Sequence, residues 1–148
     1  MMKRKTFACV VWALTALWAG FIFYMSSRVA SESAQMSGGL LEWLSKYFGA
    51  TLTEFFVRKC AHAFEFSILC GFLCAAFYAT LGSVKFLYSV GITVVYAISD
   101  EIHQLFVQGR ACRVFDVFVD FCGALVMAAF VAVVILIVNK KISKKDLF

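Results

Sequence analysis

The sequence predicts an all-α membrane protein, a bundle of four transmembrane helices, and three observations support this fold class. The chain has 148 residues, 63% hydrophobic and 16% charged, with a mean hydropathy of +0.88. Soluble domains are closer to half apolar and a quarter charged. Four apolar segments approach or exceed the roughly 20 residues that a helix needs to cross a bilayer. The charges gather at the segment ends, so the net charge of +5 indicates membrane topology rather than nucleic-acid binding.

The four transmembrane helices are expected at about residues 7–25, 55–81, 86–107 and 115–138. The first apolar stretch is long for a signal peptide and no small-residue cleavage site follows it, so we expect it to remain as a helix. Short connections at 82–85 and 108–114 predict antiparallel neighbours. No linker divides the chain, which is therefore predicted to form a single transmembrane domain over residues 1–148.

The first connection is longer and has two parts. Residues 26–39 are polar and rich in Ser and Gly, which is typical of a loop. Residues 40–48 place their apolar side chains on one helical face, and they include Trp43 and Tyr47. This second part is either a short helix in the membrane interface or an ordinary loop packed on the bundle.

The distribution of Lys and Arg predicts an orientation with both termini in the cytoplasm. Eight basic residues then lie inside and six outside. The inner set is Lys3, Arg4, Lys5, Lys85, Lys140, Lys141, Lys144 and Lys145, and the outer set is Arg28, Lys46, Arg58, Lys59, Arg110 and Arg113. The contrast is modest, but both termini and the short inner connection agree with it.

The six cysteines fall mostly inside apolar runs and form no CxxC motif. Cys70 and Cys74 lie four residues apart in the middle of a segment. We interpret the cysteines as small packing residues. A disulfide between Cys60 and Cys112 on the outer face is the alternative.

Three of the predicted helices carry polar residues near their outer ends. These residues are Arg58, Lys59, His62 and Glu65, then Asp100, Glu101, His103 and Gln104, then Asp116 and Asp120. At about 1.5 Å per residue, Glu65, Asp100 and Asp120 lie roughly 24, 22 and 27 Å from the cytoplasmic ends of their segments. Charges at such depth are costly, so these groups should face the bundle interior and pair.

Helical spacing adds detail to this layer. Asp116 and Asp120 continue along one face into Ala124, Ala128 and Ala132, a stripe of small residues suited to close packing. In the preceding segment Asp100 shares a face with His103 and Gln104, whereas Glu101 is expected to point further round.

The polar cluster can be interpreted in several ways. It is either a set of ion pairs that joins helix ends, or a pocket for an anionic headgroup. The ligand-binding candidates are Arg58, Lys59, Gln104, Arg110, Asp116 and Asp120, because arginine suits bidentate contact with phosphate or carboxylate. The candidates for acid–base catalysis are His62, Glu65, Asp100, Glu101 and His103. His62 and Glu65 with Glu101 and His103 are also an alternative zinc-ligand set, but their spacing is not that of HExxH, so we assign no metal ligands, and the sequence identifies no cofactor.

Four stretches of the chain resemble the VanZ-like family. They are residues 23–27, 58–66, 99–110 and 116–123, which include K-x-x-H-x-x-E followed by an aromatic residue, and D-E-x-H-Q-x-F-x-x-G-R. The resemblance spans nearly the whole chain. Two positions depart from the family pattern: Gln108 replaces a usual proline and Asp120 a usual asparagine.

The resemblance implies a protein of the bacterial plasma membrane with a role in the cell envelope and reduced sensitivity to teicoplanin or lipoglycopeptides. The expected partner is a membrane lipid or a lipid-linked ligand at the outer leaflet. We expect no binding of nucleic acid, and oligomers of the chain are compatible with this prediction. Binding such a molecule ranks first, and hydrolysis or group transfer on it is the alternative. A transporter ranks third, because no charge lies at the predicted membrane centre.

Overall fold

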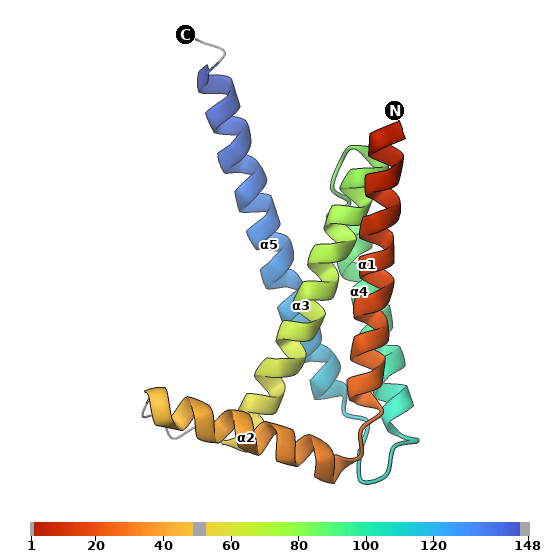
Figure 1. Cartoon of the computed structure of the whole chain (residues 1–148), viewed down its shortest axis with the longest axis vertical. Coiled ribbons are helices and arrows are strands. Elements are labelled where there is room, and N and C mark those ends of the chain that lie inside the picture. The colour runs from red at the N-terminus through yellow and green to blue at the C-terminus, as the bar shows by residue number, and fades with distance from the viewer. Residues whose placement is uncertain (1, 49–52, 146–148) are drawn as a thin grey trace.

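The computed structural model describes residues 2–48 and 53–145, and this part of the chain is helical, without strands. The helices are α1 (Met2–Ser26), α2 (Ala30–Phe48), α3 (Glu54–Leu81), α4 (Phe86–Gln104) and α5 (Val114–Lys145). Helices α1, α3 and α4 run side by side, and both termini lie at the same end of the bundle (Figure 1). Helix α2 lies across the opposite end, and α5 crosses α3 before diverging from it (Figure 1).

The prediction of an all-helical membrane protein agrees with the lengths and compositions of these helices. Within the described residues, three stretches are long and apolar enough to cross a membrane: Arg4–Ser26, Phe55–Leu81 and Val114–Ile142. Much of their surface is apolar and exposed, and only 11% of the most apolar window of α5 is buried. Helix α4, the remaining predicted span, is not among these three stretches.

The segment after α1 differs from its prediction. Residues 26–39 were expected to form a loop, yet helix α2 begins at Ala30 and continues unbroken to Phe48. Its first turn contains Glu32, a favourable position relative to the helix dipole, and Arg28 forms an ion pair with that carboxylate at 3.1 Å. Trp43 is exposed, whereas the side chains of Leu44 and Tyr47 lie outside the described part of the structure.

Local interactions define the ends of α3. The Thr53 hydroxyl accepts a hydrogen bond from the Phe56 amide at 3.3 Å, which satisfies a free donor of the first turn. At the other end Gly82 has φ 76°, and its N–H donates to the Tyr78 carbonyl at 2.8 Å. Helix α4 ends three residues before the predicted limit at 107, and α5 continues beyond 138.

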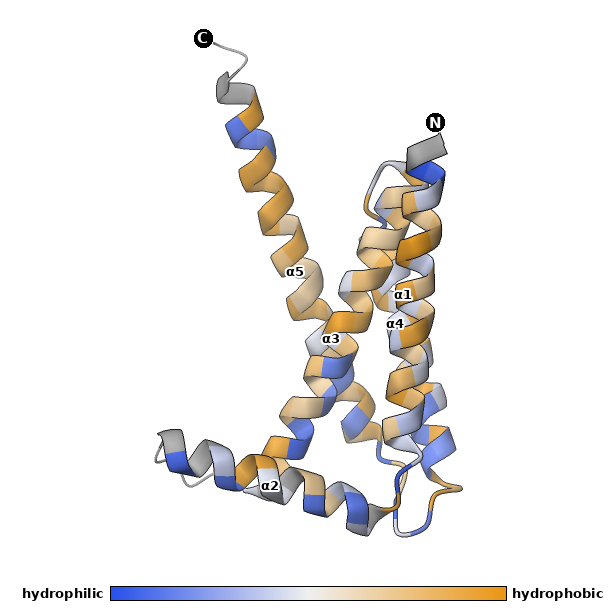
Figure 2. Cartoon of the chain, viewed as in Figure 1, coloured by the Kyte–Doolittle hydropathy of each residue, from blue (hydrophilic) through white to orange (hydrophobic). Residues whose placement is uncertain are grey.

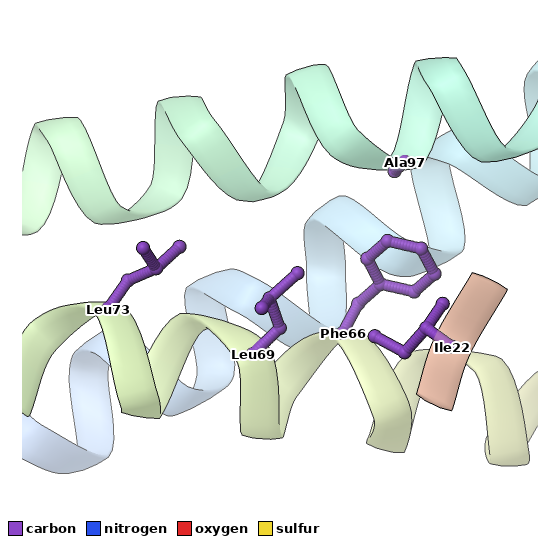
Figure 3. Packing of buried hydrophobic residues seen from close by; sticks show 5 residues of the cluster. All are labelled: Ile22, Phe66, Leu69, Leu73 and Ala97. Atoms are coloured by element: carbon purple, nitrogen blue, oxygen red, sulfur yellow. The ribbon is translucent and has the colours of Figure 1, made fainter. Parts of the chain in front are cut away.

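Two apolar clusters hold the helices together. The first contains Ile22 of α1, Phe66, Leu69 and Leu73 of α3, and Ala97 of α4 (Figure 3). The second lies between α3 and α5 and consists of Cys70, Cys74, Ala124 and Ala128. Two of the cysteines therefore pack as predicted. Cys60 and Cys112 are exposed free thiols, so the alternative of a disulfide between them is wrong.

Helices α3 and α5 approach each other closely at Gly123. A Cβ atom at this position would lie 2.9 Å from the carbonyl carbon of Ala63, closer than real Cβ atoms come to other atoms. Asp116, Asp120, Ala124 and Ala128 are all buried, which confirms the predicted inward face of this helix. A glycine and a stripe of alanines thus allow the two backbones to cross.

Candidate functional site

Hydrophilic residues gather at the end of the bundle opposite the termini, on the first turns of α3 and α5 and the last turns of α4 (Figure 2). Five of them are buried: Asp100, Glu101, Gln104, Asp116 and Asp120. The antiparallel order of α3, α4 and α5 brings these ends together, although the residues lie far apart in the sequence.

An ion pair joins α3 to α5 within this cluster. Lys59 Nζ contacts Asp116 Oδ1, and each of the two side chains is only 12% exposed. Breaking such a pair by removing one partner leaves an uncompensated charge in a poorly solvated place. The pair therefore fixes the start of α5 against the start of α3.

Hydrogen bonds organise the end of α4. Gln104 Nε2 donates to Asp100 Oδ2 at 2.9 Å, one helical turn away. Glu101 accepts a hydrogen bond from the backbone N–H of Arg113 at 2.7 Å. Glu101 was expected to point further round the helix than Asp100; its side chain is nevertheless buried, because the connection to α5 folds back and brings an amide donor to its carboxylate.

The two histidines have different surroundings. His62 Nδ1 lies 3.9 Å from Glu65 Oε2, one turn along α3. The His103 ring lies against Phe23, with centroids 4.4 Å apart, and its Nε2 is 3.1 Å from Ser27 Oγ. The predicted catalytic set therefore divides between two neighbourhoods. Among the described residues no three His, Cys, Asp or Glu side chains are placed to hold a metal ion.

The Ser27–His103 contact links the end of α1 to α4. The Ser27 hydroxyl donates its hydrogen to the Phe23 carbonyl at 2.7 Å. Its Oγ also lies 3.1 Å from His103 Nε2, within hydrogen-bond distance.

Two cavities adjoin the polar cluster. The first, here called the α2 cavity, has a volume of about 220 Å³, and its lining consists of Met25, Arg28, Ser33, Met36, Leu40, Val57, Arg58, Ala61, His62, Glu65 and Arg110. The second, here called the loop cavity, has a volume of about 210 Å³ and is lined by Phe55, Arg58, Lys59, His62, Gln104, Gly109, Arg110, Ala111, Arg113 and Asp116. Arg58, His62 and Arg110 line both cavities and thus form their common wall.

Arg110 occupies the connection between α4 and α5. Its Nε donates to the backbone carbonyl of Arg28 at 3.1 Å, which ties this connection to the end of α1. Burial lowers the pKa of the Arg110 guanidinium and the nearby charge of Arg58 lowers it further, whereas the carboxylates of Asp100, Glu101 and Glu65 act in the opposite direction. A guanidinium nevertheless stays protonated in proteins. Two positive charges therefore lie close together in a partly desolvated place, which favours an anion beside them.

Not all predicted residues line these cavities. Asp100, Glu101, His103 and Asp120 lie outside both linings. Asp100 and Asp120 are buried, and one carboxylate oxygen of each, Oδ1, has no hydrogen-bond partner among the described residues. These four residues lie on the last turns of α4 and the first turns of α5, outside both cavity walls.

Sequence reasoning missed several residues that the fold adds. Ser27 and Arg28 contact predicted cluster members, and Met36 and Leu40 of α2 line the α2 cavity. Ser27 and Arg28 carried one usable signal, since they directly follow the first apolar segment. Nothing in the local pattern of α2 indicated that its residues cover an arginine cluster.

Helix lengths, apolar surface and a charged cluster at one end together define a helical membrane protein. The chain belongs to the VanZ/LLP1 family, whose sequence model matches residues 11–137. This confirms the family resemblance. No curated protein and no solved structure matches the chain.

Proposed function

We propose that this protein spans the bacterial plasma membrane four times and binds the anionic headgroup of a lipid or lipid-linked molecule at the extracytoplasmic ends of its helices. Helix α4 has 19 residues and is therefore about 28 Å long, close to the hydrocarbon thickness of about 30 Å. The excess of Lys and Arg near the termini supports a cytoplasmic location for both ends, with the polar cluster outside.

The observation that carries this proposal is the composition of the α2 cavity. One part of its wall is apolar, from Met36 and Leu40 of α2 and Val57 of α3, and the other part holds arginines at positions 28, 58 and 110. A headgroup phosphate suits the guanidinium groups, which offer paired donors in a rigid fork. The apolar wall suits the adjoining hydrocarbon.

The experiment measures lipids bound to the purified protein by native mass spectrometry. Arg110→Ala is expected to lower the occupancy of anionic lipid at least tenfold, because it removes a charged donor from the common wall. Arg110→Lys keeps the charge but loses the paired donors of the guanidinium, so its lipid occupancy should fall between those of the wild type and Arg110→Ala. Lys85→Ala is the matched control, since it removes one positive charge beside the α3–α4 connection, at the opposite end of the bundle.

Equal occupancy in Arg110→Ala and wild type, with normal expression, would refute headgroup binding at this site. The same variants test the role in drug sensitivity. Expression of the wild type should lower sensitivity to a glycopeptide that carries an acyl chain, such as teicoplanin, and Arg110→Ala should abolish the effect. A glycopeptide without an acyl chain is the control drug.

A second candidate function is hydrolysis or group transfer on the bound molecule. It is favoured by His62 and Glu65, whose side chains lie 3.9 Å apart on the wall of the α2 cavity, a loose version of an acid–base pair. In this case His62→Gln would stop turnover of a lipid substrate while leaving its binding in place. If wild-type protein converts no lipid detectable by mass spectrometry, binding alone remains.

A further inference from the structure

The two cavities differ in chemistry although they share a wall. The α2 cavity is largely apolar, with Met25, Met36 and Leu40 on one side. The loop cavity is largely polar and offers both donors and acceptors, from the Lys59–Asp116 pair and from Gln104. An apolar space, a cationic wall and a polar space therefore follow one another across the end of the bundle.

This order matches the order of groups in a particular class of amphiphile. Building on the proposed headgroup site, we propose that the protein takes a lipid phosphodiester or diphosphate whose hydrocarbon begins in the α2 cavity, whose phosphate lies at Arg58 and Arg110, and whose neutral polar group occupies the loop cavity. A lipid phosphomonoester would leave the loop cavity to water.

Simple charge attraction predicts the opposite preference. A phosphomonoester carries about −1.5 to −2 charges near neutral pH, and a phosphodiester carries one. A surface patch of arginines would therefore bind phosphatidate more tightly than phosphatidylinositol. A site with a built second cavity binds phosphatidylinositol more tightly, because the inositol hydroxyls can replace water on Gln104 and on the Lys59–Asp116 pair.

The experiment compares these two lipids, doped at equal amounts into nanodiscs of zwitterionic lipid that hold the full chain. The wild type should bind phosphatidylinositol at least tenfold more tightly than phosphatidate. Ala111→Phe places a ring in the loop cavity and should reduce this ratio to about one. Cys112→Phe adds the same side chain at the next exposed position, outside the lining of either cavity, and should keep the ratio.

A second pair of probes identifies the source of the amphiphile. A polyprenyl phosphate is compared with the same polyprenyl phosphate bearing one hexose. Preference for the glycosylated member indicates a polyprenyl-linked ligand, and preference in the phosphatidylinositol pair alone indicates a glycerolipid. Either result supports the proposal.

Two negative outcomes distinguish the proposed headgroup site from the proposed role of the loop cavity. If the wild type binds the bare phosphates as tightly as the substituted ones, and Arg110→Ala weakens all of them, the headgroup site stands and the role of the loop cavity is overturned. If Arg110→Ala weakens none of the four lipids, the proposed function itself is overturned.

Discussion

The polar end and the terminal end of the bundle are held together by different forces. At the polar end, the Lys59–Asp116 ion pair and the Arg113–Glu101 hydrogen bond draw α3, α4 and α5 together. At the terminal end α5 separates from α3, leaving a mostly apolar groove of about 630 Å³ that includes Gly71 and Val134. The same pair of helices is therefore closed at one end and open at the other (Figure 1).

The difference shows what apolar side chains can and cannot do inside a membrane. Lipid tails solvate Leu and Val as well as a neighbouring helix does, so apolar surface alone does not force two helices together. Charged groups have no such alternative, because hydrocarbon offers them no partner. Convergence of the helices follows the charged residues, and the apolar stretch of α5 between Asp120 and Lys140 is free of that requirement.

The largest change in the difference between the two ends is expected when the cation of the buried Lys59–Asp116 pair is removed. Lys59→Met keeps most of the side-chain stem but leaves the buried Asp116 carboxylate unpaired. We expect a loss of about 3 kcal/mol in the free energy of unfolding. Thermal or denaturant unfolding in detergent measures it.

The double variant Lys59→Met with Asp116→Leu supplies the control for that experiment, since it removes both charges. It should recover much of the loss, because a buried pair contributes little net stability when both members are replaced by apolar groups. A single variant as stable as the wild type would show that the pair does not hold the helix ends.

The crossing of α3 and α5 is the next test, because it separates the closed half from the open half. Gly123→Ala should cost about 2 kcal/mol of stability, since the added Cβ meets the backbone of Ala63. Gly71→Ala meets only the flexible Met127 side chain at 3.3 Å and should cost less. Gly91→Ala, with open space around it, is the matched control and should be neutral or slightly stabilising.

A smaller effect is expected where α1 joins the polar end. Ser27→Ala removes the hydrogen-bond partner of His103 Nε2 and should lower stability by about 1 kcal/mol. The same comparison of unfolding curves measures it. A loss of several kcal/mol would mean that this contact, rather than the buried ion pair, joins the helix ends.

The smallest effect is expected at the surface of the same end. Glu32→Gln removes the ion pair with Arg28, whose partners are 51% and 39% exposed. Such exposed pairs contribute little, because water and salt screen them, so unfolding should be unchanged. A clear destabilisation would show that α2 is fixed by charge rather than by its contact with α3.

The amino-acid sequence by itself determined the helical class, the family, the level of the charged residues along three helices, and the inward face of Asp116 and Asp120. These features follow from composition and from the periodicity of 3.6 residues, which are local properties. The range of α3 was also predicted closely, as 55–81 against the observed Glu54–Leu81.

Only the tertiary structure decided the features that depend on how distant segments meet. The polar residues at the start of α2 predicted a loop, and the helix nevertheless begins at Ala30. Contact with α3 outweighs the weak local preferences of these residues. The burial of Glu101 and the partner of His103 depend on how the two connections at this end fold back. The two cavities and their shared arginine wall arise where five segments converge, and no single stretch of sequence encodes such a space.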